Sequence, residues 1–182
     1  MGAPVKSDEL AFREIFDYVT HAKSIRTVIL NGYWHHRLDK KTAAEFKHEL
    51  ETMVYLLMES GKTVYFANDV PDFGFNPGRC RATRIFSPYD PVCTQPLNEE
   101  WSNKQQILNS VMSAVSNETG AHFLNTAQYF QKEGQLFMAD DEHLFYRDDD
   151  HLGINGSYYV AQQLLRSGAL LGIVQEKLIL GE

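Results

Sequence analysis

The chain alternates short apolar runs with longer segments whose apolar residues recur at helical spacing. Residues 8–22 begin with acidic residues and carry an imperfect apolar stripe, which predicts a helix. The stripe consists of Leu10, Ile15, Phe16 and Val19. Residues 27–30, Thr-Val-Ile-Leu, are short and β-branched and precede Asn31-Gly32, so they predict a buried strand that ends in a turn.

The next two segments give clear local signals. Thr42 to Glu45 has the sequence of a capping box, and Gly61 supplies a helix stop, so a helix is expected between them. Its apolar face consists of Phe46, Leu50, Met53, Val54 and Leu57. Residues 63–67, Thr-Val-Tyr-Phe-Ala, then predict a second strand.

The second half of the chain continues the alternation. The pattern predicts a helix from about 99 to 117, a strand at 121–124, a short helix near 126–131, a strand at 144–146 and a last helix from about 153. The residues expected to face inward are Ile107, Leu108, Val111, Met112 and Val115 in the first helix, and Val160, Ala161, Leu164 and Leu165 in the last. Strands that alternate with long helices imply parallel strands with right-handed crossovers. We therefore expect an α/β fold, a three-layer α/β/α sandwich with a mainly parallel sheet, as a single domain over residues 1–182.

Composition and charge narrow the class of partner. Hydrophobic residues make up 43% and charged residues 23% of the chain, which is typical of a globular protein. The net charge of −7 disfavours nucleic acid and anionic membrane surfaces as partners. The apolar runs fall short of the ~20 residues that a bilayer span requires, and residues 1–10 lack the apolar core of a secretory signal. Any export is therefore expected to be directed by something outside this sequence.

Residues 68–96 contain all but one of the six prolines and both cysteines, so they predict a long irregular excursion. Loops of that length in compact domains are usually functional or covalently pinned. The spacing of Cys80 and Cys93 is compatible with two separate thiols and with a disulfide. A disulfide here would close a short loop and add roughly 3 kcal/mol in the chain-entropy model.

Two pairs place an aspartate three residues before a histidine: Asp140 with His143, and Asp148 with His151. Such a carboxylate can fix the imidazole tautomer and stabilise the imidazolium while the other ring nitrogen acts as a general base. The first pair lies in a polar stretch and is expected to be a solvated loop. The second lies between a predicted strand end and a helix start, where α/β folds gather their ligands, so it is the favoured candidate.

The segment 144–152, Leu-Phe-Tyr-Arg-Asp-Asp-Asp-His-Leu, followed by Gly156-Ser157, resembles the C-terminal catalytic block of SGNH hydrolase-like domains. The variety it resembles most is the extracytoplasmic SGNH domain fused behind the membrane-embedded acyltransferase-three domain of bacterial surface-polysaccharide O-acetyltransferases. Residues 27–34, which run to Trp34, and residues 61–71 match further family motifs in the same order. The resemblance covers roughly residues 25–165, and its last motif is the most specific.

The resemblance implies a function, a partner and a location. His151 would be the general base and then the acid, Asp148 its orienting carboxylate, and Cys80 and Cys93 a disulfide. It implies no cofactor, a surface-polysaccharide carbohydrate substrate, and a membrane acyltransferase domain as partner in the full-length protein. The domain would lie on the extracytoplasmic, periplasmic side of a bacterial membrane.

The sequence departs from the family at the nucleophile. Family members begin with a strand followed by Gly-Asp-Ser, and no Gly-Asp-Ser occurs in the 182 residues. We therefore expect the fold to lack its first strand and to be catalytically incomplete by itself. Ser157 is expected to support a helix N-terminus rather than attack an ester. Asn31 is a candidate oxyanion-hole remnant, although an Asn before Gly is more often a turn residue, and Trp34 is a candidate substrate contact.

Two further groups of residues invite a binding role. His35 and His36 could be metal ligands, but adjacent histidines point in different directions and the chain shows no recurring metal spacing such as His-Glu-x-x-His. We therefore expect no metal site, and histidines at the surface or at a pocket rim. Four aromatic residues could stack on a sugar ring, although such residues more often pack in a core: Tyr33, Trp34, Phe73 and Phe75.

Three functions fit these features. The first is the SGNH-like domain of an O-acyltransferase that acts on a cell-envelope carbohydrate. The second is a noncatalytic module that binds glycan or a protein partner, which the missing serine favours. The third is a carbohydrate esterase, because water and a sugar hydroxyl compete for one acyl-enzyme.

Overall fold

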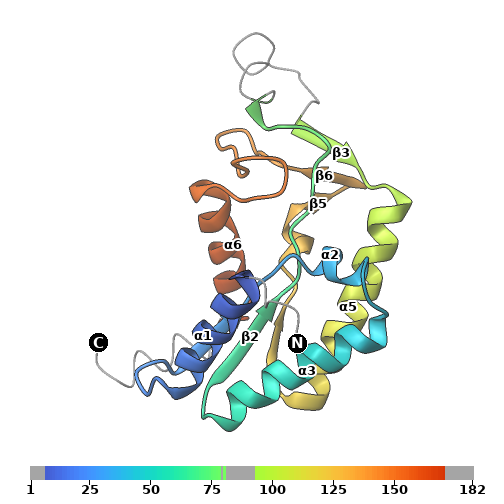
Figure 1. Ribbon diagram of the computed structural model, residues 1–182. Helices are drawn as coiled ribbons and strands as arrows, with labels where there is room; N and C mark the ends of the chain where they lie inside the picture. Colours follow the sequence, from blue (N-terminus) through green and yellow to red (C-terminus); the bar gives the residue numbers. More distant parts are fainter. Residues whose placement is uncertain (1–6, 79, 81–92, 171–182) are drawn as a thin grey trace.

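The computed structural model describes residues 7–78, 80 and 93–170, with side chains from Leu10 onward. Its centre is a parallel sheet of three strands in the order β1-β2-β4 (Figure 1). The strands are β1 (Thr27–Leu30), β2 (Thr63–Ala67) and β4 (His122–Leu124). Thr27 pairs with Thr63, and Tyr65 pairs with His122. The expected α/β class with a parallel sheet is therefore confirmed.

One face of this sheet is covered by the helices α3 (Ala43–Glu59) and α5 (Glu99–Thr119). Both helices begin at the residues that the sequence indicates. Thr42 and Glu45 form the complete capping box of α3, and the Asn98 side chain accepts the Trp101 amide at the start of α5. Helix α1 (Ser7–His21) packs two of its apolar residues against the same core.

The other face of the sheet is covered by α6 (Ile154–Arg166) over β2 and β4. Alternate strand residues point to this face, and Tyr65 and Leu124 pack there against Leu164. β1 is the edge strand, and its Ile29 is 54% exposed. The strand at 27–30 is present, but the prediction that it is buried is wrong, because no described helix covers the outer edge of the sheet on this side.

A second, antiparallel sheet lies above the parallel sheet in the view of Figure 1. This sheet was not expected from the sequence. Its order is β3 (Thr94–Pro96), β6 (Gln135–Phe137) and β5 (Gln131–Lys132). The short helix η2 (Ala127–Phe130) directly precedes β5 and matches the short helix expected near 126–131. These elements surround an aromatic cluster that includes Phe73, Phe130, Phe145 and Tyr146.

The disulfide between Cys80 and Cys93 is confirmed, with 5.3 Å between their Cα atoms. Cys80 is buried in the aromatic cluster, so the bond pins the excursion to the core beside the second sheet. Residues 79 and 81–92 of the excursion lie outside the described residues.

Two sequence expectations about elements need correction, and one helix was missed. Residues 144–146 form no regular strand and make only the isolated bridges Ala139–Leu144 and Tyr146–Leu152. The short helix α2 (Trp34–Leu38) was not predicted, because it begins where a carboxylate distant in sequence accepts its backbone amides. Several residues expected to face inward are about half exposed because they lie at the margin of their apolar stripe: Leu10, Ile15, Ile107 and Leu165.

Candidate functional site

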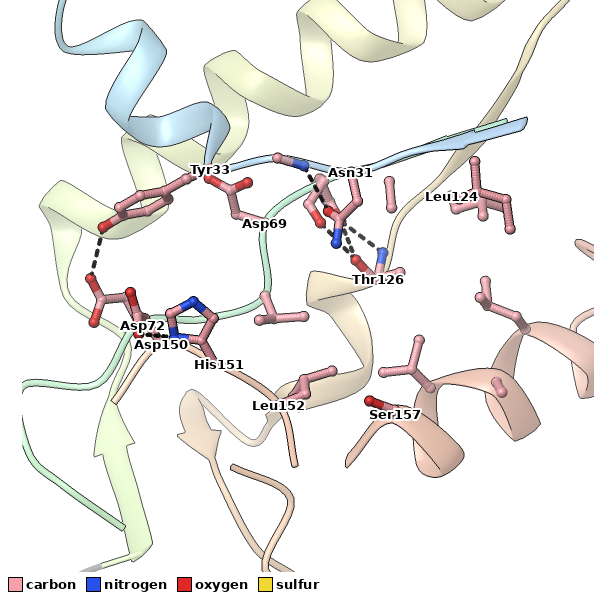
Figure 2. Close-up of a pocket in the computed structure, with 18 of the residues that line it drawn as sticks. Asn31, Tyr33, Asp69, Asp72, Leu124, Thr126, Asp150, His151, Leu152 and Ser157 are labelled. Carbon is pink, nitrogen blue, oxygen red and sulfur yellow. Dashed lines mark hydrogen bonds and ion pairs between the residues drawn. The ribbon is translucent and has the colours of Figure 1, made fainter. Parts of the chain in front are cut away.

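A pocket of about 630 Å³ lies beside the carboxyl ends of the three parallel strands. Its apolar part is lined by Ile29, Ala67, Leu124, Val160, Leu164 and Leu170. Its polar rim carries Tyr33, Asp69, Asp72, Asp150 and His151 (Figure 2). In α/β folds ligands bind outside the carboxyl ends of the strands, so this pocket is the candidate site.

His151 is placed at the rim by a tight turn over residues 148–151. The turn is closed by a hydrogen bond from the His151 amide to Asp148 Oδ1, at 2.7 Å. Antiparallel backbone contacts on either side hold its ends, because the Arg147 amide donates to the His151 carbonyl and the Gly153 amide donates to the Phe145 carbonyl. A Cβ at Gly156 would overlap the Phe145 carbonyl oxygen, so glycine allows α6 to pack directly on this backbone.

The predicted contact between Asp148 and His151 is present, with 2.9 Å between His151 Nδ1 and Asp148 Oδ1. Burial would raise the pKa of Asp148, but the hydrogen bonds from the backbone and ring of His151 lower that pKa to about 2. The hydrogen bond to Asp148 and the charge of Asp150 raise the pKa of His151 above its usual value. When Nδ1 donates to Asp148, Nε2 is the ring nitrogen left to act as a base.

Sequence reasoning missed Asp150, whose Oδ1 lies 2.6 Å from His151 Nδ1. The Asp-x-x-His spacing selects only Asp148, whereas the turn brings the intervening aspartate back to the same ring nitrogen. Asp148, Asp150 and His151 offer ligand atoms within 4.8 Å of one another, which is the geometry of a possible cation site among the described residues. In this structure His151 Nδ1 forms a hydrogen bond with Asp148 and an ion pair with Asp150.

The second Asp-x-x-His pair is a solvent-exposed turn, as expected. Asp140 Oδ1 accepts the amides of Glu142 and His143, and the His143 ring lies 3.6 Å away. Neither residue of the pair lines the pocket.

Ser157 lines the same pocket as His151, on the first turn of α6. Figure 2 shows it beyond Leu152 as seen from His151. The helix is capped at Gly153 without any side-chain hydrogen bond, so the expected capping role of Ser157 is not observed.

The two candidates at the end of β1 have different surroundings. Asn31 lines the pocket, and its Oδ1 accepts the Gly32 amide at 3.0 Å, as in a turn. Trp34 is 4% exposed, its indole nitrogen donates to the Ala67 carbonyl, and its ring packs against Phe46. The Trp34 ring therefore lies in the core rather than on the pocket.

The expected position of one histidine is wrong. His35 is 7% exposed, and its Nε2 lies 3.0 Å from Gln105 Oε1, while His36 is exposed as expected. The buried carboxylate of Asp69 accepts the backbone amides of Trp34 and His35 and so turns this segment into the core. Burial raises the pKa of Asp69 despite these hydrogen bonds.

Tyr33 is the aromatic residue that reaches the pocket rim, where its hydroxyl donates to Asp72 Oδ2 at 3.1 Å. Burial and the charge of Asp72 raise the pKa of Tyr33 to about 12. Phe73 is buried and Phe75 is half-buried against the aromatic cluster, in agreement with a packing role.

Asn68 is a further pocket residue that the sequence reasoning did not single out. Its Oδ1 accepts the amides of Thr126 and Ala127, at 2.7 and 3.0 Å. Its amide nitrogen donates to Asn109 and Asn125, so one side chain joins the ends of β2 and β4 to α5. The available signal was a polar Asn-Asp pair directly after a buried strand.

The parallel sheet, with an Asp-x-x-His turn beside the carboxyl ends of its strands, defines an α/β domain whose candidate site lies at this edge of the sheet. The model of the family "SGNH domain (fused to AT3 domains)" matches residues 4–166. The chain therefore belongs to this family.

The structure is similar to the periplasmic domain of a lipopolysaccharide acetyltransferase from Salmonella ser. Paratyphi A, with a TM-score of 0.66 and 14% sequence identity. The match covers 89% of this chain and 63% of that one, so this chain spans less than two thirds of its neighbour's length. The comparison with curated proteins returned no match. No helix within the described residues is both long and apolar enough to span a bilayer.

Proposed function

We propose that this domain serves an O-acyltransferase that transfers an acetyl group to a hydroxyl of a cell-envelope carbohydrate. His151 is the general base and then the acid, and Asp148 is its orienting carboxylate. The observation that carries this proposal is the 2.9 Å contact between His151 Nδ1 and Asp148 Oδ1 at the rim of the pocket.

The chemistry follows from the tautomer that Asp148 selects. Nε2 of His151 removes the proton of a serine hydroxyl as its oxygen attacks the acyl carbonyl carbon, and the proton then passes to the leaving group of the donor. In the second half of the reaction, a sugar hydroxyl oxygen attacks the acyl-serine ester while Nε2 takes the hydroxyl proton. Collapse of that intermediate returns the proton to the serine oxygen and releases the acylated sugar.

The serine is proposed to come from a Gly-Asp-Ser strand that this sequence does not contain. The edge position of β1 supports this assignment, because a strand added parallel to β1 would end on the side of the sheet where the pocket lies. The exposure of Ile29 beside the pocket offers apolar surface for such a segment to cover. Asn31, at the end of the same edge, is the proposed contributor to the oxyanion hole.

The proposed location is the periplasmic side of a bacterial membrane. The disulfide between Cys80 and Cys93 supports an oxidising compartment, since such bonds are rare where thiols are kept reduced. The fusion that defines the family supports a membrane acyltransferase domain as the partner that delivers the acyl group.

The test compares this chain with a version extended by an N-terminal Gly-Asp-Ser strand. The extended domain is expected to release aryl alcohol from an aryl acetate with an acyl-enzyme burst, and the chain alone is expected to stay near background. His151→Ala in the extended domain should abolish the burst, while His143→Ala, the matched change in the exposed turn, should preserve it. A burst from the chain alone that is lost in Ser157→Ala would instead identify Ser157 as the nucleophile.

The noncatalytic module remains a second candidate, because the sequence lacks the family's nucleophile. It predicts that the chain alone binds a surface glycan and that His151→Ala leaves this binding unchanged. The esterase alternative predicts release of free acetate, and no acetylated sugar, when the extended domain is given acetyl donor and acceptor together.

A further inference from the structure

We propose that Asp150 is a second positioning carboxylate of His151, which holds the ring by ion pairing with Nδ1 while Asp148 forms the hydrogen bond. The catalytic consequence of this pairing rests on the function proposed above, whereas the pairing itself can be measured on the chain alone.

The two carboxylates converge on one ring nitrogen. Asp150 Oδ1 lies 2.6 Å and Asp148 Oδ1 2.9 Å from His151 Nδ1. A neutral imidazole has one hydrogen to donate from that atom, and Asp148 forms this hydrogen bond, so Asp150 acts on the same nitrogen as an ion-pair partner. The Asp150 contact is the shorter of the two.

Asp148 has other hydrogen bonds that define its role. Its Oδ1 also accepts the backbone amides of His151 and Asp150, and its Oδ2 accepts the side chain of Arg147. Asp148 therefore closes the turn as well as contacting the ring. Asp150 lines the pocket and Asp148 does not, so Asp150 is the carboxylate on the side where a substrate would approach.

A second carboxylate near the His151 ring stabilises the protonated imidazolium. Asp72 and Tyr33 lie along the same rim, where the Tyr33 hydroxyl donates to Asp72. Burial, and then the charges of Asp150 and Asp149, raise the pKa of Asp72. Arg147 opposes protonation of His151, while Asp148 and Asp150 favour it. When His151 accepts a proton, the new positive charge lies between two carboxylates, and either one can hold the ring if the other is lost.

The direct test is a nitrogen-15 and proton NMR titration of the His151 ring in the 182-residue chain, in buffer with EDTA to exclude metal binding. Asp148→Asn and Asp150→Asn are each expected to lower the His151 pKa. The double variant should lower it further and populate the Nε2-protonated tautomer. Asp149→Asn is the matched control, because it removes the same charge from the neighbouring, exposed residue.

The titrations distinguish a specific effect of the Asp150 carboxylate on His151 from a general loss of negative charge near the turn. Asp150→Glu, which keeps the charge, should retain more of the raised pKa than Asp150→Asn. If Asp150→Asn gives the same titration as Asp149→Asn, the proposal is overturned. Backbone amide spectra of each variant would confirm that the turn is intact.

Catalysis in the Gly-Asp-Ser-extended domain gives the second readout. Each carboxylate is expected to compensate for loss of the other. The double variant should therefore reduce kcat/KM by a larger factor than the two single-variant factors multiplied together. Losses that simply multiply would overturn the shared role. Activity that survives His151→Ala would defeat the proposed function, yet the NMR titration would still decide whether Asp150 pairs with the ring.

Discussion

The turn from Asp148 to His151 combines two tasks in one carboxylate. Asp148 Oδ1 accepts the backbone amide of His151 and contacts its ring, so the same atom shapes the turn and selects the tautomer. The His151 side chain is 62% exposed, so hydrogen bonds rather than burial fix the orientation of its ring.

We expect Asp148→Asn to reduce kcat/KM of the Gly-Asp-Ser-extended domain by roughly 10- to 100-fold. An asparagine oxygen can still accept the backbone amide, and Asp150 still holds the ring, so the turn should survive. Steady-state kinetics with an aryl acetate would measure the loss, and Asp140→Asn in the exposed turn should change nothing. A loss as complete as that of His151→Ala would mean that Asp150 does not compensate.

The pH dependence follows from the raised pKa of His151. The base must be neutral to accept a proton, so the rise of kcat/KM with pH should have its midpoint above the ordinary histidine value of about 6.5. Stability has the opposite sign: the ion pairs with the imidazolium stabilise the fold below the unfolded pKa, and this contribution is lost as pH rises through the folded pKa. A kinetic midpoint below 6.5 would contradict the charge arrangement.

Among the elements, the start of α6 and the edge of β1 decide the shape of the site. Helix α6 approaches the backbone of Phe145 so closely that only Gly156 fits, and this approach fixes the turn that carries His151. β1 holds one wall of the pocket and is the edge strand of the parallel sheet within the described part of the chain.

Gly156→Ala is expected to lower the free energy of unfolding by about 1–3 kcal/mol, because the added methyl group would overlap the Phe145 carbonyl oxygen. Asn155→Ala is the matched control on the exposed side of the same helix turn and should change stability by less than about 0.5 kcal/mol. Urea denaturation would measure both. Equal stabilities for the two variants would show that α6 does not need this close contact.

Ile29→Lys tests whether an added segment covers the edge of the sheet. The chain alone should keep its stability within about 0.5 kcal/mol, since Ile29 is 54% exposed there. The extended domain should lose about 2 kcal/mol, because a charge would then be buried under the added segment. Equal effects on both proteins would argue against strand addition at β1.

In the whole molecule, the disulfide ties the long excursion to the aromatic cluster around the second sheet. Replacing Cys80 and Cys93 by serine should lower the free energy of unfolding by roughly 3 kcal/mol. Denaturant titration would measure this change. Thiol titration of the unfolded, unreduced protein should find no free sulfhydryl, and two reactive thiols would refute the bond.

The sequence by itself determined the elements whose signals are local. The capping box at Thr42, the glycine stop at Gly61 and the short β-branched runs at 27–30 and 63–67 all lie where the pattern predicts them, because capping and periodicity act within a few residues. The Asp148–His151 contact was also predicted, because its spacing occurs between a predicted strand end and a helix start. The same spacing at Asp140 and His143 leaves 3.6 Å between the ring and the carboxylate, so spacing alone does not decide the contact.

Contacts between distant segments were decided only by the tertiary structure. Asp69 draws His35 into the core across 34 residues, and the second sheet pairs β3 with β6, strands too short to give a periodic signal. Such contacts depend on long-range packing and burial, which the order of residues along a short segment does not encode.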